Sequence, residues 1–426
     1  MNSKTLSLIL TVFGLFLIAL FARNGDLIWM TLPFLAVLGL GILQSPSIEN
    51  LNLRATRSVE KNTVGGITTL SVSVAVRNLG LETVCVQFAD PLRPGMRAVK
   101  GRMRTAAALA TGSETRLQYA FQAVRGSFSW KTIRVVVSDP LGLIGTAVDL
   151  PAAAEVPVPP ELRKFRPFPL RSSRTLHTAG SNPARLGGRG TNFWGVREYH
   201  PGDPLRRIDW RRTARHPNQF FTKEFEQEEI TDIGLILDAR QKTDLRIGEE
   251  SLFEHSARAA ASLSEVFLRQ GNRVSLLIFG KQILSLFPGY GKIQLNRILH
   301  TLSKAVPEAD AGFNSLQFIP LQMFSSHSLI LILSPLAPED WRLFPRLRAH
   351  GYQALLISPD PIEYARRVLP ADPNTGLAAR LTQVERRLQI GKITQLWIPV
   401  VEWQVDQPLA PLVRTALRTS HIQQER

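Results

Sequence analysis

Cysteine is almost missing from this chain. Among its 426 residues, only Cys85 carries a thiol. A single thiol cannot form an internal disulfide bond, and it excludes zinc sites that need several cysteines. Cys85 lies in an apolar run typical of a strand, where we expect a small buried hydrophobic side chain. The fold must therefore depend on packed cores, and a chain of this length is expected to contain about two to three domains.

Motifs that bind phosphate or carry catalysis are also absent. A phosphate-binding loop needs a glycine five residues before its Gly-Lys pair. The pairs at Gly280-Lys281 and Gly291-Lys292 have Ser275 and Leu286 at that position. The sequence contains no His-Glu-x-x-His and no Gly-x-Ser-x-Gly motif. We therefore expect no catalysis by this chain, no cofactor and no bound metal.

Acidic residues are in short supply. The chain has 35 Asp and Glu against 51 Lys and Arg, a formal net charge of +16. Residues 1–46 hold Lys4, Arg23 and Asp26, a net +1, so +15 lies on the remainder. Such an excess favours an anionic partner, which would be lipid headgroups, nucleic acid or an acidic protein surface.

Two long apolar runs open the chain. Leu6–Ala22 and Leu27–Leu43 are 17 residues each, at the short end of what crosses a bilayer. Residues 23–26 form a polar turn between them, and Trp29 fits an interfacial anchor. A cleaved signal peptide would have a small-residue cleavage site after the first run, but a second apolar run follows directly. We predict an uncleaved transmembrane helical hairpin over residues 1–46.

Positive charges follow this hairpin, at Arg54, Arg57 and Lys61. Because such charges next to a span favour the cytoplasmic side, we expect a multi-pass protein of the plasma (inner) membrane whose body faces the cytoplasm.

Residues 47–160 alternate between apolar and polar types, as an all-β domain does. Leu70–Val76 has strict period two, and turn residues recur at intervals of roughly ten residues. This spacing predicts a β-sandwich, to which we assign a spacing or docking role. The strands expected are Leu70–Val76, Thr83–Phe88, Leu117–Val124, Thr132–Ser138 and Ile144–Leu150.

Residues 161–218 form a basic linker and an arginine-rich segment. The linker is rich in proline and serine and carries Arg163, Lys164, Arg166, Arg171 and Arg174. It is either a solvated connection or a contact for anionic lipid or nucleic acid, although nucleic acid is the less expected partner.

The arginine-rich segment begins at Arg197 and ends at Arg215, with six arginines and three acids. His200-Pro201-Gly202-Asp203 has the residues of a type II turn. We expect Asp203 to cap a short helix that begins at Pro204, with Leu205 and Ile208 on its apolar side and Arg206 paired with Asp209. Trp194 lies just before this segment and Trp210 within it, and each side chain carries a large apolar body. We therefore predict a tightly folded clamp between two domains, with arginine–carboxylate pairs buried against both tryptophans.

These residues resemble the signature of a bacterial family described as domain of unknown function fifty-eight. The resemblance rests on Arg197-Glu198-Tyr199, Pro201-Gly202-Asp203, Arg206-Arg207-Ile208-Asp209-Trp210 and Ala214-Arg215. Asp139-Pro140-Leu141-Gly142-Leu143 also resembles the family's signature at the end of the β domain. The resemblance implies a membrane-anchored protein with a degenerate von Willebrand factor A-type domain. It also implies partnership with a MoxR-type AAA+ ATPase in the assembly or maturation of other protein complexes.

Residues 219–426 alternate strand and helix patterns, which predicts an α/β doubly wound sheet with helices on both faces. Phe221–Phe225 is expected to be a strand before this pattern begins. The later strands expected are Ile233–Leu237, Val274–Phe279, Ile283–Phe287, Leu329–Leu333, Ala354–Ser358 and Gln395–Val400. The helices expected are Glu249–Arg269, Ile293–Val306, Glu339–Ala349, Leu377–Leu388 and Leu409–Arg418.

This part resembles the von Willebrand factor A-type fold, in which Asp-x-Ser-x-Ser after the first strand binds a divalent metal. Here the positions hold Asp238, Ala239, Arg240, Gln241 and Lys242. Both serines are replaced by cations, which cannot coordinate Mg²⁺. The fourth strand ends at Ser334-Pro335, where the fold usually has an acidic residue. We predict that the metal site is lost and that Arg240 or Lys242 pairs with Asp238.

We accordingly expect a membrane-anchored cytoplasmic scaffold or adaptor that works with a protein partner. Two alternatives remain: an enzyme that acts on an anionic cell-envelope substrate with the arginine cluster and His200, and an electrostatic binder of anionic lipid or nucleic acid. The residues expected to form the binding or structural signature are Arg197, Glu198, Tyr199, Pro201, Gly202, Asp203, Arg206, Arg207, Asp209, Trp210 and Arg215.

Overall fold

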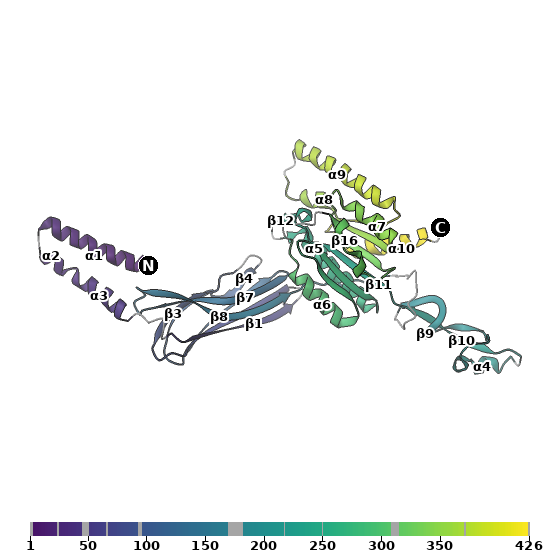
Figure 1. Ribbon diagram of the computed structural model, residues 1–426, viewed down its shortest axis with the longest axis horizontal. Coiled ribbons are helices and arrows are strands. Elements are labelled where there is room, and N and C mark those ends of the chain that lie inside the picture. The colour runs from purple at the N-terminus through teal and green to yellow at the C-terminus, as the bar shows by residue number, and fades with distance from the viewer. Residues whose placement is uncertain are drawn as a thin grey trace. The chain divides into compact units, whose positions relative to one another are not determined.

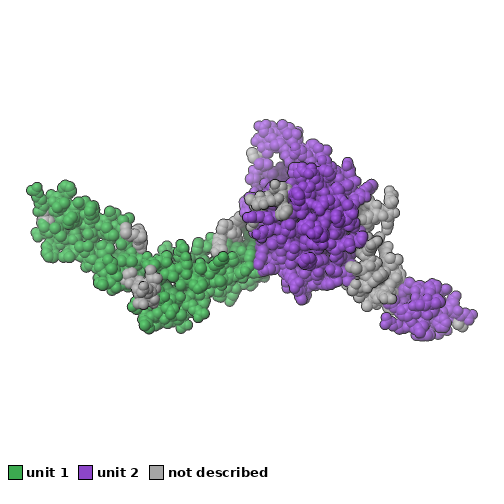
Figure 2. Space-filling model, viewed as in Figure 1, with its two compact units in different colours: residues 1–158 green, residues 159–426 purple. Residues whose placement is uncertain are grey.

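The computed structural model describes residues 3–23, 25–44, 51–64, 67–92, 96–168, 182–216, 218–248, 250–307, 315–369 and 372–424. The chain divides into two compact units, residues 1–158 and residues 159–426 (Figure 2). The first unit holds the N-terminal helices and a β-sandwich, and the second holds a β-hairpin and an α/β domain (Figure 1).

Two apolar segments begin the first unit. Lys4–Ala22 and Asp26–Leu43 are 19 and 18 residues long and, by length and composition, apolar enough to cross a membrane. The first is a single helix, α1 (Ser3–Ala22), whereas the second is divided into α2 (Asp26–Trp29) and α3 (Leu32–Leu43). Pro33 stands in the first turn of α3. Because proline has no N–H to donate to the preceding turn, it accounts for the break.

The β-sandwich consists of two four-stranded antiparallel sheets, as the alternation predicts. One sheet has the order β1-β2-β6-β4, formed by Leu53–Val64, Ile67–Asn78, Glu114–Ala123 and Met96–Gly101. The other has the order β5-β3-β7-β8, formed by Arg104–Leu109, Val84–Ala89, Gly126–Ser138 and Gly145–Val158. The sequence did not indicate β1 and β4, whose side chains are mostly exposed, or β5. The signature-like residues 139–143 form the turn between β7 and β8, so the domain does not end there.

Arg57, one of the three cations that follow the N-terminal helices, is part of the sandwich core. Its side chain is fully buried in the sandwich, where Nη2 donates to Asp90 Oδ2 at 2.7 Å. Tyr119 donates to the same oxygen at 2.8 Å, and Arg57 Nη1 donates to the carbonyl of Ala152. Of the three cations named from the sequence, Arg54 and Lys61 are exposed.

The α/β domain is built on a six-stranded sheet of order β15-β14-β11-β16-β17-β18. These strands are Leu284–Gly289, Arg273–Phe279, Asp232–Asp238, Leu329–Leu333, Gln353–Pro359 and Val400–Trp403. All neighbours pair in parallel except β15, which runs antiparallel to β14 at one edge. This order confirms the doubly wound, von Willebrand factor A-like architecture.

Helices cover both faces of this sheet because its strands are apolar on both sides (Figure 1). On β11, Leu235 and Leu237 belong to one core and Ile236 to the other. The first core is closed by α5 (Leu252–Arg269), α6 (Gly291–Lys304) and α10 (Leu409–Gln424). The second is closed by α7 (Leu343–Ala349) and by the end of α9 (Pro373–Thr394).

Several element boundaries of the α/β domain differ from the prediction. The strand expected at Gln395–Val400 begins only at Val400, because α9 runs to Thr394 and turns continue up to Trp397. α5 starts at Leu252 rather than Glu249, since Ser251 accepts a capping hydrogen bond from the amide of Glu254. The helix expected from Glu339 is a 3₁₀ turn, η6 (Asp340–Arg342), followed by α7.

Candidate functional site

The arginine-rich signature lies on a β-hairpin of its own. β9 (Asn182–Glu198) pairs antiparallel with β10 (Phe221–Glu229), and the signature occupies the end of β9 and the connection. The connection contains a 3₁₀ turn, η2 (Leu205–Arg207), and a single helical turn, α4 (Trp210–Thr213). We call residues 193–224 of this element the signature hairpin.

The predicted turn at the tip of β9 is present. The amide of Asp203 donates to the carbonyl of His200 at 3.0 Å, and Gly202 has a φ of +108°. A type II turn needs a positive φ at its third position, which glycine adopts without a steric penalty. The turn brings Asp203 back beside β9.

Arg197 holds that turn against both strands. Its Nη1 and Nη2 donate to Asp203 Oδ2 and Oδ1, both at 2.8 Å, and its Nε donates to Glu224 Oε1 at 2.8 Å. This is the bidentate pairing expected for the signature, and Glu224 of β10 is an additional partner that the sequence did not indicate. The hydrogen bonds from Arg197 and from the amide of His200 lower the pKa of Asp203 to about 2.

The capping roles differ from the prediction. Asp203 does not cap a helix, because its carboxylate is taken by Arg197 and His200. Asp209 caps α4 instead, accepting from the amide of Arg212 at 3.2 Å. The expected Arg206–Asp209 ion pair is not found among the described contacts of the signature hairpin.

The apolar residues of the signature hairpin divide between a small core and its surface. Ile208 and Phe221 are buried, and Tyr199 packs edge-on against Phe220 with ring centroids 6.3 Å apart. Trp210 and Leu205 are 63% and 68% exposed, so burial of Trp210 against the arginine pairs is wrong. The Trp194 side chain lies outside the described residues. The remaining large exposed apolar side chains here are Phe193 and Phe220.

Cations surround this exposed surface. Arg212 lies over the ring of Phe221 at 5.1 Å, with most of its side chain exposed. Pro201, Gly202 and His200 form the exposed turn, and Arg207 is half-buried. The other signature residues that face solvent are Glu198, Arg206, Arg211 and Arg215. The signature therefore combines a rigid internal pair, Arg197–Asp203, with an outer surface of apolar and basic side chains.

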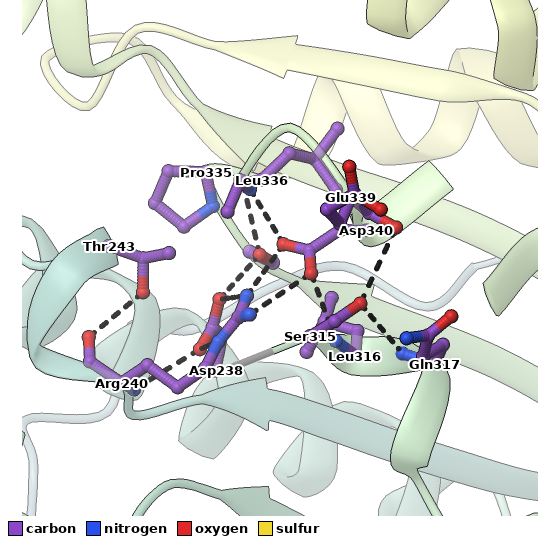
Figure 3. Close-up of polar contacts among 12 residues, drawn as sticks. Asp238, Arg240, Thr243, Ser315, Leu316, Gln317, Pro335, Leu336, Glu339 and Asp340 are labelled. Atoms are coloured by element: carbon purple, nitrogen blue, oxygen red, sulfur yellow. Dashed lines mark hydrogen bonds and ion pairs between the residues drawn. The ribbon is translucent and has the colours of Figure 1, made fainter. Parts of the chain in front are cut away.

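A second cluster lies at the carboxyl ends of β11 and β16, where a doubly wound sheet places its ligand site. Arg240 is fully buried between Asp238 and Asp340 (Figure 3). Its Nε and Nη2 donate to the two oxygens of Asp238 at 2.8 and 2.7 Å. Its Nη1 and Nη2 donate to the two oxygens of Asp340 at 3.0 and 2.6 Å. Of the two cations considered from the sequence, Arg240 thus contacts Asp238, and Lys242 is exposed.

Asp340 and Ser334 complete this cluster. Ser334 donates to Asp238 Oδ2 at 2.7 Å, and Asp340 accepts from the amides of Leu316 and Ala337 at 2.9 and 2.6 Å. Asp340 supplies the carboxylate that the sequence appeared to lack after β16, six residues beyond Ser334. Burial lowers the pKa of Arg240, but hydrogen bonds and charges from Asp238 and Asp340 outweigh it and hold that pKa above its ordinary value.

The cluster does not fit a divalent ion. The guanidinium of Arg240 occupies the space between the carboxylates, and every carboxylate oxygen accepts at least one hydrogen bond from it. A cation placed there would have to displace a buried positive charge that satisfies both acids. The described residues also contain no group of three or more His, Cys, Asp or Glu arranged to hold a metal.

Arg386 ties α9 to the same edge of the sheet. This buried side chain donates to the carbonyl of Pro335 at 2.7 Å and to Ser358 Oγ at 2.9 Å. Pro335 follows β16 and Ser358 lies near the end of β17. Burial lowers the pKa of Arg386, which Asp360 and Glu402 partly offset. This role could not be predicted from the sequence, because the partners are mostly backbone carbonyls.

Comparisons with known proteins bear on the signature and the α/β domain. Residues 195–376 match the model of a family described as "Protein of unknown function DUF58". The "Uncharacterized protein YeaD" of Bacillus subtilis (strain 168) is 26% identical over 294 residues, covering 67% of this chain and 70% of the relative.

Solved structures align less extensively. An uncharacterized membrane spanning protein from Vibrio fischeri aligns at 14% identity over 31% of this chain and 71% of its own, with a TM-score of 0.17. A β-glucosidase from Kluyveromyces marxianus aligns at 14% identity over 25% of this chain, with a TM-score of 0.10. This chain spans 14% of that enzyme's length.

Proposed function

This chain belongs to the DUF58 family, and we propose that it is a membrane-anchored adaptor whose signature hairpin docks a protein partner. The partner proposed is a MoxR-type AAA+ ATPase, and the joint task is the assembly or maturation of other protein complexes. The adaptor carries out no reaction of its own. Its two apolar N-terminal segments would tether it to the plasma (inner) membrane, with the body on the cytoplasmic side.

The exposed apolar surface of the signature hairpin carries this proposal. Trp210, Leu205 and Phe220 face solvent beside Arg211 and Arg212. Tryptophan and arginine are the residues that most often dominate the binding energy of protein interfaces, and clustered exposed apolar groups mark such sites. A charged surface that contacts only solvent would gain no stability from exposing these large apolar side chains.

The pairs of Arg197 support the same role by fixing the shape of the hairpin. Arg197 joins the tip turn through Asp203 and the opposite strand through Glu224. An interface that is rigid before binding loses less conformational entropy when the complex forms. The Arg197–Asp203 pair would thus hold the shape of the hairpin, while the exposed side chains contact the partner.

The buried arginine of the α/β domain supports a mode of recognition that needs no divalent ion. In A-type domains with a metal, an acidic side chain of the partner completes the coordination of the ion. Here Arg240 already satisfies Asp238 and Asp340, so a partner's carboxylate has no metal to reach. Recognition would therefore rest on surface side chains.

The experiment compares Trp210→Ala with Trp397→Ala. Trp397 is a matched control because it is 65% exposed and lies elsewhere in the second unit. The full chain in detergent is titrated against the purified MoxR-type ATPase of the same genome by biolayer interferometry. We expect Trp210→Ala to raise Kd about 30-fold, the effect of losing a contact of about 2 kcal/mol, while Trp397→Ala leaves Kd unchanged.

Thermal melts accompany the binding measurements. Because Trp210 is largely exposed, Trp210→Ala should leave the melting temperature unchanged. Equal affinity of the wild type and Trp210→Ala for the ATPase, or no binding by either, would contradict the proposed function.

One observation favours a second candidate, the binding of a small anionic ligand. A pocket of about 240 Å³ is lined by Arg163, Lys164 and Arg258, beside Phe165 and Trp403. Three cations around an aromatic-lined hollow would attract phosphate or carboxylate groups. Binding of inorganic pyrophosphate that weakens steeply with salt and is lost in Arg258→Gln would support this candidate. Pyrophosphate binding that is unaffected by Arg258→Gln would exclude this pocket.

A further inference from the structure

Helix α9 turns its apolar side away from the protein. Over residues 375–386 its inward face is formed by Thr375, Ala379, Gln383 and Arg386, which are small or polar; buried apolar residues follow only at Ile390 and Ile393. The opposite face presents Leu377, Leu381, Val384 and Leu388, which are 59%, 60%, 55% and 65% exposed. A surface helix of a globular domain normally shows the reverse arrangement, with its apolar stripe on the core. We call these four residues the α9 stripe.

The outward direction of the α9 stripe is fixed by how the helix is held. Arg386 bonds to the ends of two strands, and Ile390 and Ile393 are buried at the C-terminal half. At the N-terminus, Asp372 caps the helix by accepting from the amide of Thr375 at 2.6 Å. Rotating the stripe inward would place the apolar side chains at the sheet and carry Arg386 out of its buried bonds. The helix runs along the outside of the α/β domain (Figure 1).

The spacing of the stripe identifies the shape of its partner. The intervals are four, three and four residues, the a and d positions of a heptad. Such a narrow stripe is the seam of two packed helices, whereas a helix lying in a membrane surface has a wider apolar face. The seam is about 16 Å long at 1.5 Å per residue, so it accommodates roughly three turns of another helix.

Charges beside the stripe identify the chemistry of that helix. Arg380 and Arg387 flank one edge, both exposed, and neither forms an ion pair with another described residue. The other edge carries Glu385 and Lys392, and Lys392 lies over the ring of Trp341 at 5.1 Å. The free charge beside the seam is therefore mainly positive, which favours a partner with glutamates at its flanking positions.

A second copy of this chain fits the stripe less well. In a parallel pair of α9 helices, Arg380 would face Glu385 of the other copy, but Arg387 would face Lys392, so one contact is favourable and one is not. In an antiparallel pair, the edges bearing Arg380 and Arg387 would face each other. Either arrangement leaves an arginine opposite a cation, and like charges across such a seam are unfavourable.

We propose that the α9 stripe is a docking surface for an acidic amphipathic helix of a partner protein. It deepens the proposed function, because an adaptor needs a surface beyond the signature hairpin, but it depends on none of that hairpin's residues. Four side chains bury less than the roughly 1,200 Å² of a stable interface, so the contact would be weak and readily reversed. Such a contact suits a client that is bound and released.

The experiment uses a fluorescent three-heptad peptide with leucine at the a and d positions and glutamate at e and g. A control peptide has lysine at e and g. Fluorescence anisotropy with the full chain in detergent should show saturable binding of the acidic peptide and at least about tenfold weaker binding of the basic one. The double variant Leu381→Gln, Leu388→Gln should abolish binding of the acidic peptide, whereas Leu81→Gln, which changes a 94% exposed leucine of the sandwich, should not.

A charge-reversal variant tests the role of the two arginines beside the α9 stripe. The double variant Arg380→Glu, Arg387→Glu should prefer the basic peptide, because only the sign of the flanking charge has changed. No saturable binding of the acidic peptide up to millimolar concentration would overturn the proposal. So would a dimer, or binding to phosphatidylglycerol vesicles, that disappears in Leu381→Gln, Leu388→Gln. Trp210→Ala should bind the acidic peptide normally, so failure of the signature hairpin and failure of the stripe are distinguishable.

Discussion

Replacing the buried cation of the α/β domain should convert an ion-independent fold into one that Mg²⁺ stabilises. The perturbation is Arg240→Ser combined with Lys242→Ser, which restores the Asp-x-Ser-x-Ser pattern after β11. Arg240 donates four charge-assisted hydrogen bonds, two to Asp238 and two to Asp340. Breaking a buried ion pair by removing one partner typically costs about 3–5 kcal/mol, because the remaining charge is left uncompensated. We expect a loss of at least that size in the absence of metal.

Oxygen groups would then surround a vacated, negatively charged space. Asp238, Asp340 and Ser334 supply carboxylate and hydroxyl oxygens, and the two new serines add hydroxyls. Mg²⁺ prefers such ligands. At a metal concentration 100 times Kd, binding to the folded state stabilises it by about 2.7 kcal/mol. With roughly 2–4 °C per kcal/mol for a domain of this size, the melting temperature should rise by about 5–11 °C.

The assay is thermal unfolding of the full chain in detergent, with and without about 10 mM MgCl₂. Lys242→Ser alone is the matched control, because that side chain is exposed and should leave both melts unchanged. The wild type should show no metal-dependent shift. A clear stabilisation of the wild type by Mg²⁺ would refute the reasoning even if the double variant failed to fold. Equal stability of the wild type and the double variant without metal would refute it as well.

Two further predictions concern pH. Because the folded pKa of Asp203 is about 2, below its ordinary 3.8, the Arg197–Asp203 pair should stabilise the signature hairpin above about pH 4 and lose its effect as pH falls through 2. Trp210 fluorescence should report this acid transition, and Asp203→Asn should remove it; a transition that persists in the variant would contradict the assignment. Burial, aided by the charge of Arg258, lowers the pKa of His255 to about 4 from 6.5. The unfolded chain therefore binds a proton that the folded chain does not, and stability should fall by about 3 kcal/mol from pH 6.5 to 4. Urea unfolding across this range should show the loss in the wild type and not in His255→Phe, and parallel pH curves would disprove it.

Much of the architecture could be predicted from the sequence, because apolar runs of buried strands and the apolar–polar alternation of half-exposed strands are strong local patterns. Ile233–Leu237 and Leu329–Leu333 are short apolar runs next to turn residues, and both are strands within one residue of the prediction. Gln395–Val400 is also rich in apolar residues, but only Val400 lies in a strand: α9 runs to Thr394, turns follow up to Trp397, and β18 begins at Val400. Local composition does not contain that information.

The sites were predictable only where the partners are neighbours in sequence. Asp238 and Arg240 are two residues apart after a strand, so their contact could be anticipated. Asp340 is 100 residues from Arg240 and reaches it only because β11 and β16 pair in parallel, with Leu237 opposite Leu333. Glu224 likewise reaches Arg197 through the register of β9 and β10, in which Gly195 pairs with Glu224. Register depends on the whole hairpin or sheet, and the alternation of one strand does not define it.

Burial of Trp210 was wrongly predicted from the sequence, and the exposed α9 stripe was not predicted. The prediction for Trp210 assumed that a large apolar side chain faces a core, but much of any protein surface is apolar. In this chain the sandwich and the sheet bury their apolar residues on cores, so exposed stripes elsewhere are not needed for folding. Exposed apolar side chains of this kind lower the solubility of the folded chain and add nothing to its stability. Local features that oppose the global fold in this way are expected at functional sites. Binding of a partner at the signature hairpin and at α9 would therefore bury the apolar side chains that the isolated chain exposes.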